Sequence, residues 1–275
     1  MRAILLARRP WLKRPKRGPR APANRLIVVF YAFSREVALL KRRLKERVPL
    51  NRHGLKGFRA AAGDGEIAFI ATGIGIARAR EVARHALGVF PQAHLVIGTG
   101  VVGALSGGLR PGDIVVADRV VKAGDDGTHP EHVLAVGAEE LERCERVLRA
   151  AGLAFSTGGI LTSSRVLPDL HSKRLAKEQS GAIAVDMESV AIALEAAARG
   201  LPFVVVRTVM DSLEDEVFGA EVADEHGRIR PLAATSYLVR NPGTFLKLPR
   251  MLRNLALAGK SLADAIEALT LGAAP

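Results

Sequence analysis

The sequence predicts an α/β fold. Short runs of β-branched and aliphatic residues alternate along the chain with longer segments whose apolar residues recur at helical spacing. Turns rich in glycine and proline separate these segments, an order that is typical of a sheet covered by helices. The chain has 275 residues, of which 48% are hydrophobic and only 4% aromatic, so it is long enough for one large domain with an aliphatic core or for two small ones. It shows no internal repeat and no long linker.

The predicted elements follow one another from residue 26 to residue 207. The first strand, residues 26–30, is a buried β-branched run, and Ser34 is placed to cap the helix that follows it. Gly200 is placed to end the helix predicted over 189–199. We expect further strands at 66–71, 94–97, 114–117, 159–161, 183–185 and 203–207, and further helices at 76–87 and 139–150.

The chain carries a formal net charge of +12 that is unevenly distributed. Residues 1–20 hold eight Lys and Arg residues and no acid, so we expect a basic, disordered extension over 1–24 and a single domain over 25–275. Contact between the extension and acidic lipid or nucleic acid is an alternative, and nucleic acid is the less favoured partner.

The single cysteine, Cys144, permits no internal disulfide and indicates a reducing compartment. Its helical surroundings favour packing over a nucleophilic role. The apolar run at 4–7 is too short for a signal peptide, and no uninterrupted apolar stretch reaches the roughly 18 residues of a membrane span. We therefore predict a cytoplasmic protein, with peripheral contact at the inner membrane surface as an open alternative.

The stretch 244–271 is predicted to be a basic amphipathic helical region. Such a helix can lie on an anionic membrane surface. It can equally cover the apolar core or a dimer seam, which is the alternative that we favour. Its apolar residues at near-helical spacing are Phe245, Leu248, Leu252 and Leu255, and the basic residues among them are Lys247, Arg250, Arg253 and Lys260.

The segment 184–211 contains the residues that most clearly indicate chemistry. An acidic pair brackets Met187 at a predicted helix start, and the strand that follows leads to an arginine and a further aspartate. Open α/β sheets bind small molecules at the carboxyl edge of their strands, so acidic side chains at this edge indicate a site. The charged residues in question are Asp186, Glu188, Arg207 and Asp211.

Four motifs stand in order between residues 25 and 211. They are Thr72-Gly73-Ile74-Gly75, Gly98-Thr99-Gly100-Val101-Val102-Gly103, Pro111-Gly112-Asp113-Ile114, and Val185-Asp186-Met187-Glu188 followed by Val204-Val205-Val206-Arg207 and Asp211. Together they resemble the nucleoside phosphorylase and nucleosidase superfamily, especially the methylthioadenosine/S-adenosylhomocysteine nucleosidases. Asp186 departs from that pattern, which has Glu at this position. The resemblance implies a three-layer α/β/α sandwich around a mixed, twisted sheet, a homodimer or larger homo-oligomer, and no cofactor or metal.

The resemblance further implies cleavage of the N-glycosidic bond of a purine nucleoside of the adenine type. Asp211 would assist departure of the base, because a leaving purine develops negative charge and a partly desolvated carboxyl group favours its protonated form. Glu36 matches the residue that positions or activates the attacking water. The alternatives are a helix N-cap for Asp211 and a first-turn helix acid for Glu36.

The implied ribose site centres on Glu188, whose carboxylate would accept hydrogen bonds from two vicinal hydroxyls. Met187 would pack on the sugar face, and Arg207 would orient Glu188 through a bidentate pair. The alternative for Glu188 is an acid at a helix start that interacts with the helix dipole.

The glycines of the second motif have the spacing of a dinucleotide fingerprint. The next predicted strand begins only about ten residues after Gly103, however, which leaves no room for a crossover helix. We therefore expect these glycines to let the backbone approach a ligand. In the resembling family this loop lies under the ribose and base, and the implied substrate-binding residues are Gly75, Gly100, Val101 and Gly103.

Base contacts are implied for Val166, by stacking, and for Leu167, through its backbone. The family often has Phe at the first of these positions, and Ser164 replaces an Asp just before it. The base pocket therefore departs further from the family pattern than the ribose site does.

Several alternatives for the reaction remain open. We favour water over phosphate as nucleophile, because Gly98 and Val101 stand where hexameric phosphorylases have Arg and Ser, and because the charge of Glu36 would repel phosphate. Arg35 and Arg78 could form a substitute phosphate cradle. The motif 185–189 and the basic C-terminus also resemble the hopanoid-associated phosphorylases, proposed to remove adenine from adenosylhopane. Futalosine hydrolase is another candidate, and a non-catalytic nucleoside-binding protein is the alternative of a different class.

Overall fold

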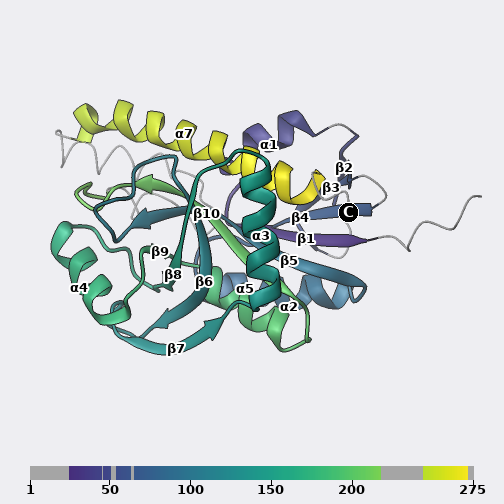
Figure 1. The fold of residues 1–275 in the computed structure, drawn as a ribbon, viewed down its shortest axis with the longest axis horizontal. Coiled ribbons are helices and arrows are strands. Elements are labelled where there is room, and N and C mark those ends of the chain that lie inside the picture. The colour runs from purple at the N-terminus through teal and green to yellow at the C-terminus, as the bar shows by residue number, and fades with distance from the viewer. Residues whose placement is uncertain (1–24, 45, 51–53, 63–64, 218–243, 272–275) are drawn as a thin grey trace, which may run out of the picture.

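The computed structural model describes residues 25–44, 46–50, 54–62, 65–217 and 244–271. The basic extension predicted over 1–24 lies outside the described residues. Within them, ten strands form one mixed sheet that carries helices on both faces, so the predicted α/β fold is confirmed (Figure 1).

The sheet contains both parallel and antiparallel pairs. Strand β5 pairs with β1, β10 and β9, so that β5, β10, β6, β8 and β9 close into a ring while β1, β4, β3 and β2 extend from it. Strands β1, β4, β5 and β10 run parallel to one another, which brings their carboxyl ends to one edge. The strands are β1 (Leu26–Tyr31), β2 (Val48–Pro49), β3 (Gly57–Ala62), β4 (Gly65–Ala71), β5 (Ala93–Ala104), β6 (Ile114–Ala123), β7 (Pro130–Ala135), β8 (Phe155–Thr162), β9 (Ala184–Asp186) and β10 (Phe203–Asp211).

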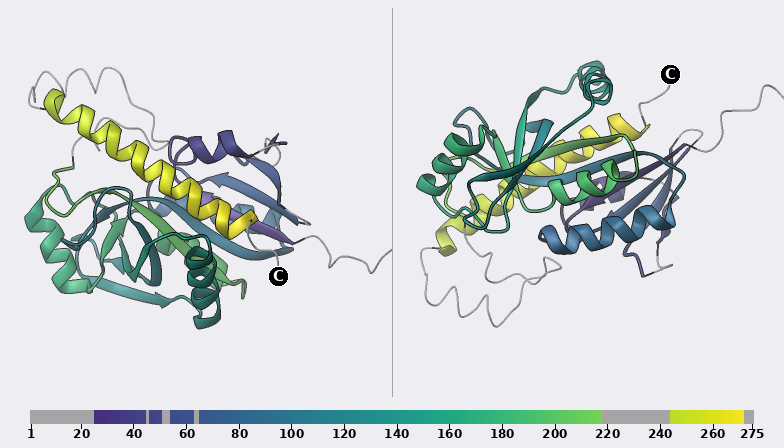
Figure 2. Two further views of the ribbon diagram at one scale, coloured as in Figure 1. Left: turned by 45° about the horizontal axis from the view of Figure 1, so that its top comes forward. Right: turned by 90° about the horizontal axis from the view of Figure 1, so that it is seen from below.

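Helices pack on both faces of the sheet. One face is covered by α1, α3 and α7, and the opposite face by α2 and α5, while α4 lies beside the β8 and β9 end (Figures 1 and 2). These helices are α1 (Ala38–Arg43), α2 (Ile76–Val89), α3 (Ala138–Ala150), α4 (Leu170–Ser180), α5 (Ser189–Ala197) and α7 (Thr244–Leu271).

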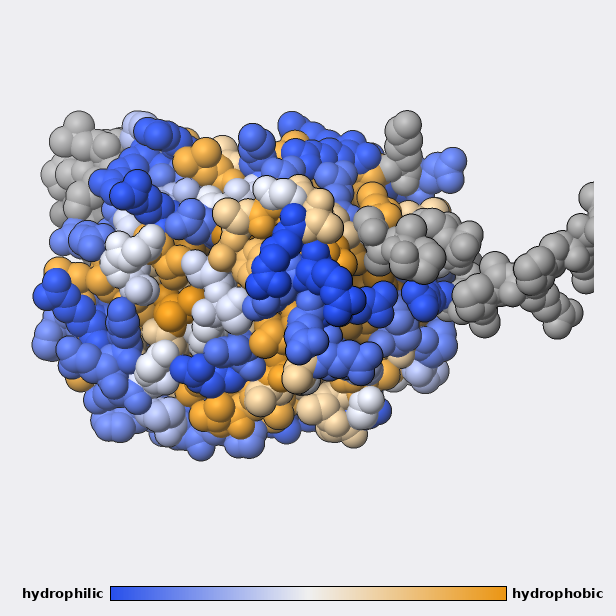
Figure 3. Space-filling model, viewed as in Figure 1, coloured by the Kyte–Doolittle hydropathy of each residue, from blue (hydrophilic) through white to orange (hydrophobic). Residues whose placement is uncertain are grey.

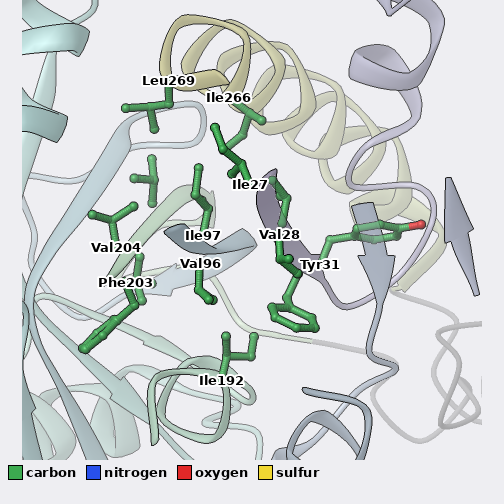
Figure 4. Close-up of a cluster of buried hydrophobic side chains, with 14 of the residues drawn as sticks. Ile27, Val28, Tyr31, Val96, Ile97, Ile192, Phe203, Val204, Ile266 and Leu269 are labelled. Atoms are coloured by element: carbon green, nitrogen blue, oxygen red, sulfur yellow. The ribbon is translucent and has the colours of Figure 1, made fainter. Parts of the chain in front are cut away.

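The core lies on both sides of β1, β5 and β10. Ile266 and Leu269 of α7 pack above these strands, and Ile192 of α5 packs below them (Figure 4). All six residues of β1 are buried, because helices cover both of its faces. Each aliphatic side chain buried in this way contributes about 1.5–3 kcal/mol relative to an exposed one. The edge of the sheet that carries the motifs is thus anchored in a rigid core.

Strand β5 is longer than predicted. The sequence predicts a strand over 94–97 and a glycine loop after it, but the chain stays extended to Ala104. Pairing with β10 continues along this stretch as far as Gly103. The loop prediction is wrong because backbone pairing with a neighbouring strand overrides the low strand propensity of glycine.

The predicted N-cap at Ser34 is also wrong. Helix α1 begins only at Ala38, and its N-cap position, Val37, makes no side-chain capping bond. The preceding residues form a tight turn in which the Glu36 carboxylate accepts the N–H groups of Ala32 and Phe33 at 2.8 and 3.0 Å. Glu36 therefore lies in this turn and not in the first turn of the helix.

Four elements were not predicted from sequence: β2, β3, β7 and α4. Strand β3 is rich in alanine, and its antiparallel pairing with β4 holds it in the sheet. Helix α4 begins with a capping box between Asp169 and Ser172, although few of its residues are buried. These elements are determined by side-chain capping and by pairing with distant strands, so the hydrophobic periodicity of the sequence does not predict them.

Helix α7 spans the stretch in which the sequence predicts a basic amphipathic helix. Ala258, Leu262 and Ile266 are buried against the sheet, and Arg43 of α1 bridges to Asp264 of α7 at 2.6 Å. Its C-terminal half thus covers the core, the favoured alternative. Leu252 in the N-terminal half of α7 is 50% exposed. On the side of the molecule seen in Figure 3, hydrophilic and hydrophobic areas are intermixed. Among the described residues, no helix has the combined length and hydropathy needed to cross a membrane.

Candidate active site

The carboxyl ends of β1, β4, β5 and β10 lie at one edge of the sheet, and the turn after β1, the turn before α2 and the start of α5 meet there. This edge brings together Glu36, Gly75, Gly100, Val101, Glu188 and Arg207, with Gly103 and Asp211 further along β5 and β10. These segments are far apart in sequence, as the resemblance implies.

Glu36 is held by backbone N–H groups from two elements. In addition to the two bonds within its own turn, its Oε1 accepts the N–H of Val101 in β5 at 3.0 Å. The side chain is almost fully buried, at 2% exposure. Burial raises the pKa of the Glu36 carboxyl, while the Arg207 charge and the backbone N–H groups oppose that rise. The carboxylate is therefore fixed in position and poised to hold a proton more readily than a free glutamate.

Gly100 allows Glu36 and Arg207 to approach β5. Its φ of 137° lies in the region that favours glycine. A Cβ at this position would lie 2.5 Å from Nη1 of Arg207 and 2.6 Å from Oε1 of Glu36. A side chain at this position would have to displace one or both of these groups, so the glycine leaves room for two charged side chains.

Arg207 has different partners from those predicted. It is fully buried, its Nη2 lies 2.6 Å from Oδ2 of Asp186, and its Nη1 donates to the Thr99 carbonyl at 2.8 Å. Its Nε and Nη2 also donate to the Ser189 hydroxyl, at 3.2 and 2.9 Å. The prediction that Arg207 forms a bidentate pair with Glu188 is wrong, because Asp186 and Ser189 occupy the guanidinium.

Asp186 is the acceptor at the centre of a buried network. Its Oδ1 accepts the Thr162 hydroxyl at 2.7 Å, and Oδ2 accepts the N–H of Ser189 at 3.1 Å as well as the hydroxyl of that residue. The Thr162 hydroxyl in turn accepts the N–H of Val190 at 3.0 Å. Sequence reasoning missed this role of Thr162 and Ser189. The signal available was Ser189 three residues after Asp186, a spacing typical of side-chain capping.

Glu188 occupies the N-cap position of α5 but makes no capping bond with that helix. Its Oε1 instead accepts the N–H of Gly75 at 2.8 Å, which joins the start of α5 to the turn before α2. The pKa of Glu188 is raised to about 8, mainly by burial and secondly by the negative charge of Asp186. No described residue donates a hydrogen bond to its Oε2, so this carboxyl retains acceptor capacity.

Asp211 ends β10 and pairs with a lysine that the sequence did not indicate. Nζ of Lys173, from α4, lies 2.6 Å from Oδ2 of Asp211. Burial raises the pKa of the Asp211 carboxyl, and the adjacent Lys173 ammonium opposes that rise. Asp211 lies within the strand and makes no N-cap contact, which removes the helix-cap alternative.

Three further predicted residues lie in less defined surroundings. Met187 and Val166 are half-buried; Met187 directly follows Asp186 in the sequence, and Val166 lies four residues after Thr162. Leu167 is buried in a small apolar cluster with Leu105, Val121, Leu161, Ala176 and Ala182. The side chain of Leu167 is thus used in packing, and only its backbone remains for a base.

An open pocket of about 1140 Å³ lies over the start of α2. It reaches the carboxylate cluster formed by Glu36 and Glu188 at Gly75, the residue whose N–H donates to Glu188. The pocket therefore adjoins the cluster and does not enclose it. Its lining residues are Ile74, Gly75, Ile76, Ala77, Arg78, Arg80, Glu81, Arg84, His85 and Ser164.

The chain is similar to known nucleosidases. A 5′-methylthioadenosine/S-adenosylhomocysteine nucleosidase of Staphylococcus aureus (strain bovine RF122 / ET3-1) is 26% identical over 211 residues, which cover 73% of this chain and 91% of the relative. The Streptococcus pyogenes S-adenosylhomocysteine nucleosidase, solved in complex with 5-methylthiotubericidin, superposes with a TM-score of 0.68 at 20% identity and covers 93% of this chain and 100% of that one. The futalosine hydrolase of Helicobacter pylori has a TM-score of 0.64 at 17% identity and covers 88% and 97%.

These two structural likenesses show a shared fold. The family profile of the phosphorylase superfamily matches residues 26–236, which is most of the chain and includes every segment of the candidate site. The resemblance noted from the four sequence motifs is thereby confirmed, and the chain belongs to the phosphorylase superfamily of enzymes.

Proposed function

We propose that this enzyme cleaves the N-glycosidic bond of a purine nucleoside and releases a free base of the adenine type. The observation that carries the proposal is the placement of three carboxyl groups, Glu36, Glu188 and Asp211, from separate segments along the same edge of the sheet. In each of the three, burial raises the pKa. Ionisable groups perturbed in this way cluster at catalytic sites. Similarity to nucleosidases supports the same reaction.

Glu188 is assigned to the ribose. The Gly75 N–H fixes one carboxylate oxygen, and the other is left to accept sugar hydroxyls. Positive charge develops on the sugar as the glycosidic bond breaks, so these hydrogen bonds strengthen in the transition state. Met187, half-buried next to Glu188, is assigned to the face of the sugar.

Asp211 is assigned to the leaving base. When the C1′–N9 bond breaks, its electron pair moves to the purine, and a proton transferred to N7 neutralises the developing charge. Burial raises the pKa of the Asp211 carboxyl, which therefore holds a proton more readily than a free aspartate and is suited to donate it to the base.

Glu36 is assigned to the nucleophile, and we favour water over phosphate. The N–H of Val101, which could help to cradle an anion, is already held by Glu36 at 3.0 Å. Gly98 and Gly100 on the same strand offer no side-chain donors, and an ionised Glu36 repels phosphate. A water that loses its proton to this carboxylate is the better fit.

The cellular setting is part of the same proposal. We place the enzyme in the cytoplasm, because Cys144 is a free, buried thiol, as expected in a reducing compartment. That it forms a homodimer or larger homo-oligomer and requires no cofactor or metal is proposed from the family resemblance alone. Peripheral membrane contact through the exposed residues 249–253 of α7 is the less favoured alternative.

The test is a panel of purine nucleosides incubated with the purified chain, with and without inorganic phosphate. The expected result is free adenine and an unphosphorylated sugar at a rate that does not depend on phosphate. A phosphate-dependent rate with a sugar 1-phosphate as product would reverse the choice of nucleophile and favour phosphorolysis. Nucleoside binding without any base release would contradict the proposed reaction.

A further inference from the structure

A buried lysine on α4 points its charge at the end of β10. Lys173 is fully buried, although lysine is among the residues least often buried. Its Nζ lies 2.6 Å from Oδ2 of Asp211 and donates to the carbonyls of Ser212 and Asp215 at 2.9 and 2.8 Å. All three N–H donors of the ammonium are thereby used, which identifies the charged form as the one that fits.

The same contacts fix the orientation of Asp211. Lys173 holds Oδ2 on one side, and on the other side β5 approaches so closely that a Cβ on Gly103 would lie 2.9 Å from Oδ2. No described residue donates to Oδ1, and the Asp211 side chain keeps 14% of its surface exposed. One oxygen is therefore anchored in the protein, and the other is left for a proton and a ligand.

A further charged residue lies near this pair among the described residues. Asp215, in the turn after β10, adds negative charge near Asp211, and its own carboxylate is held by Ser212 and by Arg250 of α7 at 2.7 Å. Burial disfavours the ionised form of Asp211, and the Lys173 ammonium favours it. Lys173 is the cation that directly opposes the effect of burial.

We propose that Lys173 is a positioning residue for the leaving-group acid: it orients Asp211 and stabilises the carboxylate that forms when Asp211 protonates the departing base. This inference rests on the proposed function. In the step concerned, the C1′–N9 bond breaks, the Oδ1–H bond of Asp211 breaks, and the proton goes to N7 of the purine. Asp211 is then a carboxylate paired with the Lys173 ammonium, and solvent returns the proton between turnovers. Lys173 itself touches neither sugar nor base.

The sequence explains why such a residue is hard to detect. Lys173 is one of several basic residues on a polar helix, where a solvated position is the usual interpretation. Its burial depends on three acceptors that converge on Nζ: the Asp211 carboxylate at the end of β10 and two carbonyls of the turn that follows. A buried ammonium needs an acceptor for each of its N–H groups, and these three oxygens supply them.

The experiment compares full-length Lys173→Met, Lys173→Arg and the parent chain. Lys177→Met, which removes an exposed lysine of the same helix, is the matched control. Release of adenine from 5′-methylthioadenosine and adenosine is measured as kcat and kcat/KM against pH. A second substrate, 4-nitrophenyl β-D-ribofuranoside, has a leaving group that departs without protonation.

We expect Lys173→Met to lower kcat for the purine nucleosides by at least about tenfold, within the range of general-acid contributions. Without the ammonium the neutral acid is favoured, so the fall in kcat/KM at high pH should move to higher pH. Cleavage of the nitrophenyl riboside should change by less than about threefold, Lys173→Arg should recover part of the loss, and Lys177→Met should match the parent.

Equal losses on both kinds of substrate, with an unshifted pH profile, would show a merely structural role and overturn the inference. Parent-like purine turnover by Lys173→Met would overturn it as well. If Lys173→Met does not fold, Lys173→Arg decides, because its altered reach must slow purine substrates selectively. If the parent releases no base from any nucleoside, the proposed function itself has failed, an outcome distinct from these.

Discussion

Glu36 and Arg207 both reach the point at Gly100 where a side chain would begin. A Cβ at Gly100 would lie within 2.6 Å of a polar atom from each of them. Arg207 in turn pairs with Asp186, and Glu36 holds the N–H of Val101. Gly100 therefore leaves room for the Arg207 guanidinium, which pairs with Asp186, and for the carboxylate of Glu36, a candidate catalytic acid.

Replacing this glycine should disrupt the site. We expect Gly100→Ala to reduce base release by at least about 100-fold, because even a displacement of about 1 Å in a catalytic group can cost that factor. The added methyl must push Glu36 or Arg207 away, and a φ of 137° is strained for alanine.

The matched control for this change is Gly88→Ala in α2, where an added Cβ meets no atom within 4 Å. That substitution should leave turnover unchanged and stabilise the helix by roughly 0.5–1 kcal/mol. Steady-state kinetics and urea unfolding measure both effects. Parent-like turnover in Gly100→Ala would show that the packing around Glu36 has no part in catalysis.

The buried ion pair between Arg207 and Asp186 should be costly to break. We expect Asp186→Ala to lower the free energy of unfolding by about 3–5 kcal/mol, because it leaves an uncompensated guanidinium in the interior. Asp118→Ala breaks the half-exposed pair with Arg119 and should cost at most about 1 kcal/mol. Urea denaturation of the two variants tests the contrast, and similar losses in both would contradict it.

Glu188 should recognise the ribose hydroxyls most strongly in the transition state. The parent should therefore cleave an adenine ribonucleoside faster than its 2′-deoxy counterpart, and Glu188→Ala should reduce that preference. The measurement is the ratio of kcat/KM for adenosine and 2′-deoxyadenosine. Equal discrimination by parent and variant would remove Glu188 from the ribose site.

Glu188 should also make stability depend on pH. Its pKa is raised to about 8 in the folded chain, above its ordinary value of 4.5, so the unfolded state loses this proton first. The stabilising contribution is complete below the ordinary pKa and is lost as pH rises towards 8. The free energy of unfolding should fall across this window, and the fall should be shallower in Glu188→Gln. An identical slope in parent and variant would contradict the assignment.

Much of the fold follows from local patterns in the sequence. The β-branched runs of β1 and β10 are long and apolar enough to indicate buried strands, and the charged residues towards the end of β10 indicate the edge that carries the site. Gly75 and Gly100 were expected to bring backbone close to a ligand. The structure shows that the Gly75 N–H donates to Glu188 and that Gly100 makes room for two protein side chains, while their contact with a ligand stays a prediction.

The contacts that sequence reasoning missed depend on pairs far apart in the chain. Lys173 lies 38 residues from Asp211, and no local periodicity marks a single lysine as buried. The resemblance implies Glu188 as the partner of Arg207, but the partner is Asp186. The two acids are only two residues apart, so the sequence does not show which of them faces Arg207 until β10 and the start of α5 are placed. Long-range packing decides such choices, and a single sequence does not encode it in a readable form.

The central claim is that this chain breaks the bond between a purine and its ribose, with Asp211 assisting the base. The most direct measurement is chromatographic detection of free adenine from 5′-methylthioadenosine, S-adenosylhomocysteine and adenosine, with the parent chain and with Asp211→Asn. The account predicts adenine release from at least one of these nucleosides by the parent, and a rate about 10²–10⁴ lower in the folded variant. Nucleoside binding by calorimetry without adenine release, or equal rates in parent and variant, would contradict it.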